Sequence, residues 1–156
     1  MKVLILYFTK TGHTLEAVNA TVEGIRNAGS EVEIAEVKGF NPDRLSEFDA
    51  LIVGSPCWGG SMMKKGGIAA PVRKAIKSFG QEVLKGKRCG GISVHGGNGG
   101  QNTIKSIGNI LQEKGCEDYR PGPVAAAGVA LSLWKGPSVK PEDEERYRNY
   151  GSEFVK

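Results

Sequence analysis

Three short turns of this chain have residue types that suit the binding of a ligand. The first has the sequence Thr-Lys-Thr-Gly-His-Thr at residues 9–14, between an apolar run and a helical pattern. Backbone N–H groups at a helix N-terminus attract anions, and threonine hydroxyls add hydrogen-bond donors. This composition favours a phosphomonoester held mostly by neutral dipoles, with helix capping by the threonines as the alternative. The expected phosphate-binding residues are Thr9, Lys10, Thr11, Gly12, His13 and Thr14.

The second turn, residues 55–60, places a tryptophan among residues that break strands. A large ring beyond the end of a strand either covers a planar partner or folds back onto the core, and both arrangements fit this sequence. The glycines after Trp58 allow the neighbouring peptides to adopt positive φ angles. The residues expected to contact a flat ligand are Ser55, Pro56, Cys57, Trp58, Gly59 and Gly60.

The third turn, residues 95–101, is rich in glycine. Glycines let backbone N–H and C=O groups approach the edge of a flat ligand closely. The expected contact residues are His95, Gly96, Gly97, Asn98 and Gly99. We expect the imidazole of His95 to hydrogen-bond within the loop, with contact to the ligand as the alternative. His13 is expected to be a solvent-facing residue of its turn rather than a catalyst.

Other kinds of site find no support in the sequence. Paired carboxylates, a Ser–His–Asp order and an H-E-x-x-H motif are all missing, so neither hydrolysis nor metal catalysis is indicated. The glycine patterns of Walker loops and dinucleotide folds are missing as well. Cys57, Cys89 and Cys116 are too far apart to form a metal-ligand pair and are expected to be reduced thiols. No apolar run reaches the ~18–20 residues of a membrane helix and no signal peptide is expected, so we expect a cytoplasmic protein.

Hydrophobic patterning predicts the elements that position these turns. The expected strands are 3–8, 31–34, 50–53, 87–94 and 124–127, and the expected helices are 15–25, 70–79, 103–114 and 141–155. Strands that alternate with helices form a parallel sheet with right-handed crossovers. We therefore predict an α/β fold, a three-layer doubly wound five-stranded parallel sheet. Because ligands of such folds bind beyond the carboxyl ends of the strands, the three turns should meet there.

Charge is unevenly distributed along the 156 residues, whose formal net charge is +4. Residues 61–90 contain eight Lys or Arg residues and one acidic residue, so this band carries +7 and the rest of the chain −3. Such a band could attract an anionic ligand or an acidic partner, or it could be a solvated helix face. Nucleic-acid binding is not indicated, because no recognition-helix pattern or interleaved aromatic residues accompany the charge.

Together the three turns resemble those of the flavodoxin-like family of FMN proteins, which includes flavodoxins and NAD(P)H:quinone reductases. The matching motifs are T-x-T-G-x-T at 9–14, Gly54-Ser55-Pro56 with Trp58, and the glycine-rich loop. The resemblance implies one flavodoxin-like FMN-binding domain over residues 1–156, with strand order 2-1-3-4-5. It also implies that the 9–14 loop holds the FMN phosphate and that the other two turns bracket the isoalloxazine ring.

Two functions remain open within this family. One is an electron carrier whose bound FMN serves redox partner proteins, and the other is an FMN enzyme that takes hydride from NAD(P)H. Carriers of the family are usually acidic and have a second aromatic residue after the fourth strand, whereas this chain is basic and residues 95–101 contain none. Trp134 could supply that second wall, although we expect it to cap the last helix instead. We favour the carrier, without membrane insertion, and keep the reductase as the alternative.

Overall fold

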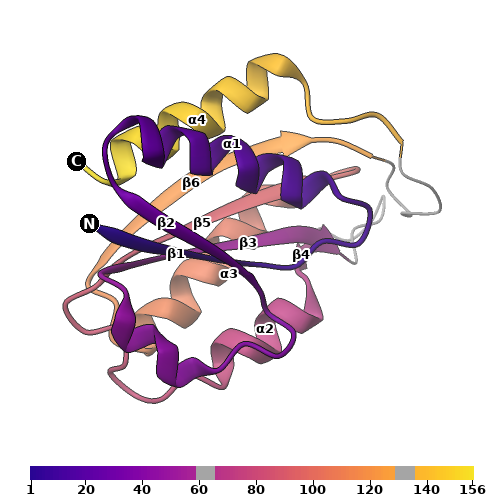
Figure 1. Cartoon of the computed structure of the whole chain (residues 1–156). Helices are drawn as coiled ribbons and strands as arrows, with labels where there is room; N and C mark the ends of the chain where they lie inside the picture. The colour runs from indigo at the N-terminus through magenta and orange to yellow at the C-terminus, as the bar shows by residue number, and fades with distance from the viewer. Residues whose placement is uncertain (59–65, 129–135) are drawn as a thin grey trace.

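The sheet of this protein has parallel strands in the order β2-β1-β3-β5-β6. The computed structural model (Figure 1) describes residues 1–58, 66–128 and 136–156. The parallel strands are β1 (Lys2–Tyr7), β2 (Glu31–Glu36), β3 (Ala50–Trp58), β5 (Arg88–His95) and β6 (Asp118–Ala126). A short strand, β4 (Gly67–Ile68), pairs antiparallel with the end of β3. The five parallel strands follow the predicted order, with β4 as an addition.

Helices cover both faces of the sheet, as Figure 1 shows. One face carries α1 (His13–Asn27) and α4 (Pro141–Phe154). The other carries α2 (Ala70–Lys77), α3 (Gly100–Glu113) and the 3-10 helix η1 (Pro42–Glu47). Each layer has its own apolar core, one between the sheet and α1 with α4 and the other between the sheet and α2 with α3. The predicted three-layer, doubly wound α/β fold is thereby confirmed.

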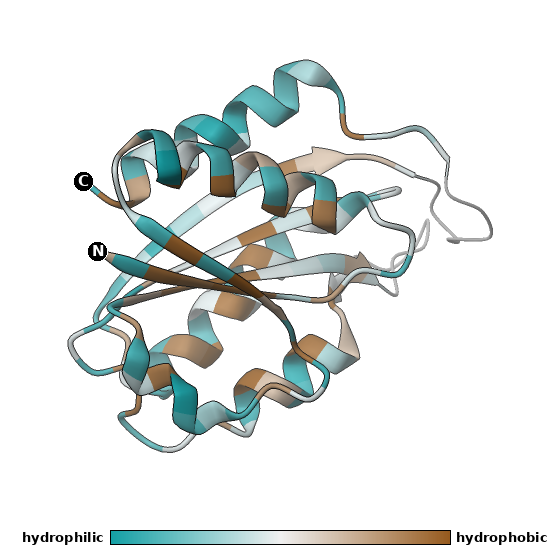
Figure 2. Ribbon diagram, in the orientation of Figure 1, coloured by the Kyte–Doolittle hydropathy of each residue, from teal (hydrophilic) through white to brown (hydrophobic). Residues whose placement is uncertain are grey.

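The interior strand β1 and the edge strand β2 differ in burial, as their sequences predict. Residues 3–6 of β1 are fully buried, because helices cover both faces of this strand. In β2 the pattern alternates, and Ile34 is one of the exposed large apolar residues of the described chain. Figure 2 shows β1 as mostly hydrophobic and the outer surface of α4 as mostly hydrophilic. Among the described residues, no helix is long and apolar enough to cross a membrane.

Three predicted boundaries were wrong. Strand β3 continues to Trp58 rather than ending at 53, so the predicted turn 55–60 begins within a strand that pairs with β5 up to residue 56. The last strand begins at Asp118 rather than 124, because β6 contains Pro121 and Pro123, which sequence rules exclude from central strands. At the edge of a sheet, where β6 lies, prolines are tolerated. Helix α3 begins at Gly100 rather than 103, so the predicted loop 95–101 ends within a helix. Neither β4 nor η1 was expected.

Helices α1 and α4 cross in close contact through two glycines. A Cβ atom at Gly24 would overlap the backbone carbonyl of Arg148 and lie 2.9 Å from the Ser152 nitrogen. A Cβ atom at Gly151 would in turn overlap the carbonyl of Thr21. The two backbones therefore approach each other more closely than any residue with a side chain would allow.

Candidate functional site

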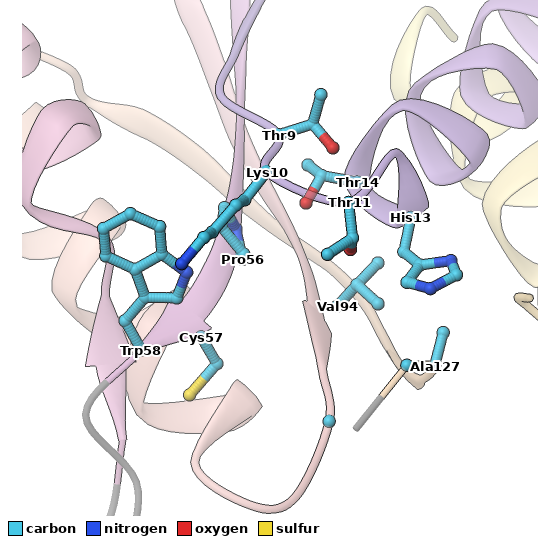
Figure 3. A pocket seen from close by; sticks show the side chains of 12 residues that line it. Thr9, Lys10, Thr11, His13, Thr14, Pro56, Cys57, Trp58, Val94 and Ala127 are labelled. Atoms are coloured by element: carbon cyan, nitrogen blue, oxygen red, sulfur yellow. The ribbon is translucent and has the colours of Figure 1, made fainter. Parts of the chain in front are cut away.

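A cavity opens at the carboxyl ends of the parallel strands (Figure 3). Its lining includes these residues predicted from sequence: Thr9, Lys10, Thr11, His13, Thr14, Pro56, Cys57, Trp58 and Gly96. The cavity is partly open to solvent, and its volume is about 30 Å³.

The 9–14 turn presents donors to this cavity. Gly12 has a φ of +95° and directly precedes α1, and its N–H donates to Oγ1 of Thr9 over 3.0 Å. No side chain in the described part of the chain caps α1, so the positive end of this helix is available to a ligand. Thr11 and Thr14 supply hydroxyl groups and Lys10 a cation. This donor set fits a phosphate dianion.

His13 is buried, with 4% of its surface exposed, so its prediction as a solvent-facing residue was wrong. It is the first residue of α1, and its ring lies inside the cavity near Ala127 (Figure 3). Its Nδ1 lies 3.1 Å from Oε2 of Glu16, one helical turn further on. The same carboxylate oxygen accepts a hydrogen bond of 2.9 Å from the N–H of Val139. Glu16 thus connects α1 to a segment 123 residues away.

These contacts control the ionisation of Glu16. Burial alone would raise the pKa of Glu16, but hydrogen bonds from the Val139 N–H and from His13 outweigh it and lower this pKa below its ordinary value of 4.5. A carboxyl group whose pKa is lowered by folding stabilises the folded state above its unfolded-state pKa. That contribution disappears as the pH falls through the lowered pKa of the folded state.

A Glu16→Gln substitution is expected to lower the free energy of unfolding by about 1 kcal/mol at pH 7, because it removes the charge but keeps an acceptor for Val139. The difference from the wild type should close as the pH falls through the lowered pKa of Glu16 in the folded state, where Glu16 itself becomes protonated. Urea unfolding of both proteins at several pH values measures this. Glu31→Gln, at an exposed residue without an ion pair among the described residues, is the control. A difference in the free energy of unfolding that does not change with pH would contradict the lowered pKa assigned to Glu16.

Trp58, the last residue of β3, forms one wall of the cavity. Its ring packs edge-on against Phe8, with 5.2 Å between the ring centroids and an interplanar angle of 89°. The Nζ atom of Lys10 lies 5.8 Å from its centroid. Of the two predicted arrangements, the structure shows Trp58 packed against the core. The residue also lines the cavity, and its contact with a planar ligand stays a prediction.

The end of β3 is connected to the glycine-rich loop and to β4. The thiol of Cys57 donates to the carbonyl oxygen of Asn98, with 3.1 Å between Sγ and O. Burial raises the pKa of Cys57, so its thiol keeps the proton needed for this bond at neutral pH. The hydroxyl oxygen of Ser55 accepts a 3.0 Å hydrogen bond from the N–H of Ala69, directly after β4.

Residue 99 must be a glycine because the backbone of Gly66 lies too close for a side chain. Its φ is +90°, and a Cβ atom there would lie 2.5 Å from the carbonyl oxygen of Gly66 and 2.6 Å from its nitrogen. We had expected the glycines of this loop to serve the approach of a ligand. At Gly99 the structure shows instead a close approach to the chain that leads into β4.

Comparison with known proteins gives two kinds of relative, while no family model matches the chain. Flavodoxin 2 of Bacillus cereus superposes with a TM-score of 0.76 at 20% identity, over 99% of this chain and 98% of that one. The flavodoxin of Megasphaera elsdenii gives 0.75 at 18%, over 98% of each chain. Curated sequence relatives are named NAD(P)H dehydrogenase (quinone). That of Chromohalobacter salexigens is 29% identical over an alignment of 144 positions, which covers 73% of this chain and 68% of the relative.

The NAD(P)H dehydrogenase (quinone) of Caulobacter vibrioides is 33% identical over an alignment of 133 positions, which covers 70% of this chain and 66% of the relative. The chain belongs to the flavodoxin-like superfamily. It spans about two thirds of the length of these curated relatives. Flavodoxins and quinone-type NAD(P)H dehydrogenases are FMN proteins, so the comparisons agree with the cofactor that the sequence resemblance implies.

Several predicted site residues of this flavodoxin-like chain lie outside the cavity. Ser55 is fully buried beneath it. A neighbouring hollow on the other side of the loop is lined by His95, Gly97, Asn98 and Gly99. Nδ1 of His95 is buried without a hydrogen-bond partner among the described residues, so the expected bond within the loop is not made by this atom. Gly59, Gly60 and Trp134 lie outside the described residues.

Sequence reasoning missed three lining residues, Val94, Ala127 and Gly128. Val94 belongs to β5, and the other two follow β6. The rule that ligands bind at the carboxyl ends of the strands could have identified Ala127 and Gly128, because the fifth strand was predicted to end at 127. No metal site was predicted, and the described residues contain no group of three or more His, Cys, Asp or Glu that could hold a metal ion.

Proposed function

We propose that residues 1–156 form a single FMN-binding domain that carries electrons between partner proteins. The observation that carries this proposal is the joining of the 9–14 turn and Trp58 in one cavity at the carboxyl ends of the strands. The turn would hold the phosphate, and Trp58 and the glycine-rich loop would flank the flavin ring. When bound, FMN supplies the redox chemistry by accepting and donating electrons.

The lining of the cavity supports binding rather than acid–base catalysis. No carboxylate is among the lining residues that the structure describes. His13 is engaged by Glu16, and the Cys57 thiol donates to the Asn98 carbonyl. Electron transfer through a flavin needs no protein group that reacts with a substrate, so this lining suits a carrier. The three free cysteines fit a reducing compartment such as the cytoplasm.

An NAD(P)H-dependent reductase is the second candidate, and two observations favour it. Curated relatives with 29–33% identity are named NAD(P)H dehydrogenase (quinone). In addition, the described loop 95–99 offers no aromatic residue opposite Trp58. A hydride donor must stack on one face of the flavin, and such an open face would admit it.

Anaerobic mixing of the FMN-loaded protein with NADPH, and separately with NADH, distinguishes the two candidates. For a carrier we expect the flavin absorbance near 450 nm to persist for minutes, although dithionite bleaches it at once. Rapid bleaching by either nucleotide would contradict the carrier and support the reductase. The dithionite sample shows that the bound flavin can be reduced, so a negative result has a definite meaning.

A further inference from the structure

Helix α2 carries an exposed group of positive charges, which we call the α2 cations: Arg73, Lys74 and Lys77. The helix contains no acidic residue, and none of the three side chains forms an ion pair with the described residues. Most other arginines are neutralised locally. Those with carboxylate partners are Arg44, Arg88, Arg120, Arg146 and Arg148.

The helix that carries the α2 cations begins next to the proposed flavin site. Helix α2 begins two residues after β4, and β4 pairs with the end of β3 through Cys57↔Ile68 and Trp58↔Gly67. The N–H of Ala69 is held by the Ser55 hydroxyl oxygen over 3.0 Å. The first turn of α2 is therefore fixed to the strand whose tryptophan lines the cavity. The exposed Lys10, 5.8 Å from the centroid of that ring, adds a further cation to this rim.

The opposite layer of the molecule has the opposite charge. Helix α4 contains five acidic and two basic residues, and Figure 1 shows it on the other face of the sheet from α2. The acidic residues in its first turn are Glu142, Asp143 and Glu144. A molecule with this charge distribution orients an approaching charged partner before contact, which raises the association rate at low ionic strength.

We propose that the α2 cations are the docking surface for an acidic electron-transfer protein. The charge is complementary to such a partner, and the position of α2 next to Trp58 would bring the partner to the mouth of the cavity. An acidic protein surface fits better than a nucleic acid, because the cluster spans little more than one helical turn and has no aromatic or recognition-helix pattern. This inference rests on the proposed function, since electrons would pass to or from FMN.

The test measures binding and electron transfer with one probe, a small acidic [2Fe–2S] ferredoxin. The variant reverses the three charges (Arg73→Glu, Lys74→Glu, Lys77→Glu). The control reverses three exposed charges elsewhere (Arg26→Glu, Lys105→Glu, Lys140→Glu) and thus changes the net charge equally. Affinity is measured by titration between 20 and 300 mM salt. Reduction of the FMN-loaded protein by reduced ferredoxin is followed by stopped flow.

We expect the wild type to bind ferredoxin with an affinity that falls as salt rises. The α2 variant should lose at least tenfold in affinity and in transfer rate at low salt, and the control should lose less than threefold. Equal losses in both variants would overturn the proposal, as would tighter binding of a 20-base-pair duplex DNA than of ferredoxin. Dimerisation of the wild type that is abolished in the α2 variant would also overturn it, because α2 would then contact the acidic α4 of a second copy.

The binding and electron-transfer measurements distinguish a failure of this inference from a failure of the proposed function. Salt-sensitive binding through α2 without FMN reduction would uphold the docking surface and contradict the carrier. Rapid reduction of bound FMN that is insensitive to the α2 substitutions would uphold the carrier and contradict the docking surface.

Discussion

A Gly99→Ala substitution is expected to lower the free energy of unfolding by about 3 kcal/mol and to weaken FMN binding at least tenfold. Two costs combine here. The φ of +90° is unfavourable for any residue with a side chain, and the new methyl group would lie 2.5 Å from the Gly66 carbonyl oxygen. Relief of that clash requires the loop to move away from the end of β3. That movement would break the Cys57–Asn98 bond. It would also move the glycine-rich loop, which is proposed to flank the flavin ring.

Gly39→Ala is the matched control for this prediction. Gly39 also has a positive φ, +77°, but a Cβ atom there would meet nothing within 4 Å. It therefore measures the backbone cost alone, about 1 kcal/mol, and FMN affinity should not change. Urea unfolding and flavin titration of both variants measure the two effects. Equal losses of stability, or unchanged FMN affinity in Gly99→Ala, would contradict the role assigned to the Gly66 contact.

The largest loss of stability is expected from Gly24→Ala, about 3–5 kcal/mol. The new Cβ atom would overlap the carbonyl of Arg148, which is backbone and cannot rotate away as a side chain can. The two helices would have to separate, which would disturb the apolar core around Ile25, Tyr147 and Phe154. Gly151→Ala should behave similarly, because its Cβ atom would overlap the carbonyl of Thr21.

Gly80→Ala provides the control for the helix contact. Gly80 is exposed, has no positive φ, and offers open space for a Cβ atom. Its replacement should leave stability unchanged or raise it by a few tenths of a kcal/mol through the lower entropy of the unfolded chain. Thermal and urea unfolding of the three variants make the comparison. A loss below 1 kcal/mol in Gly24→Ala would show that α1 and α4 can separate at little cost.

The fold could be predicted from sequence because local patterns determine it. The buried run of β1 and the helical periodicity of α1 and α3 define a parallel α/β sheet, and the carboxyl-end rule then joins turns far apart in the chain. On this basis Thr11, Pro56 and Gly96 were expected in one site, and the structure places all three in one cavity. Their role in binding FMN stays a prediction.

The features of the site that could not be predicted from sequence depend on contacts between distant residues. His13 pairs with Glu16 on its own helix, but Glu16 is held in turn by the N–H of Val139, 123 residues away. The contact of Gly99 with Gly66 likewise arises only when two turns meet. Neither contact leaves a local pattern, since a histidine or a glycine in a polar turn usually faces solvent.

The central claim is that the amides and hydroxyls of residues 9–14 bind the phosphate of FMN. Titration of the flavin-free protein with FMN and with riboflavin, followed by flavin fluorescence at pH 7.5, tests it most directly, because the two ligands differ only in the phosphate. We predict that FMN binds at least 100-fold more tightly than riboflavin. Equal affinities, or no binding of FMN, would contradict the account.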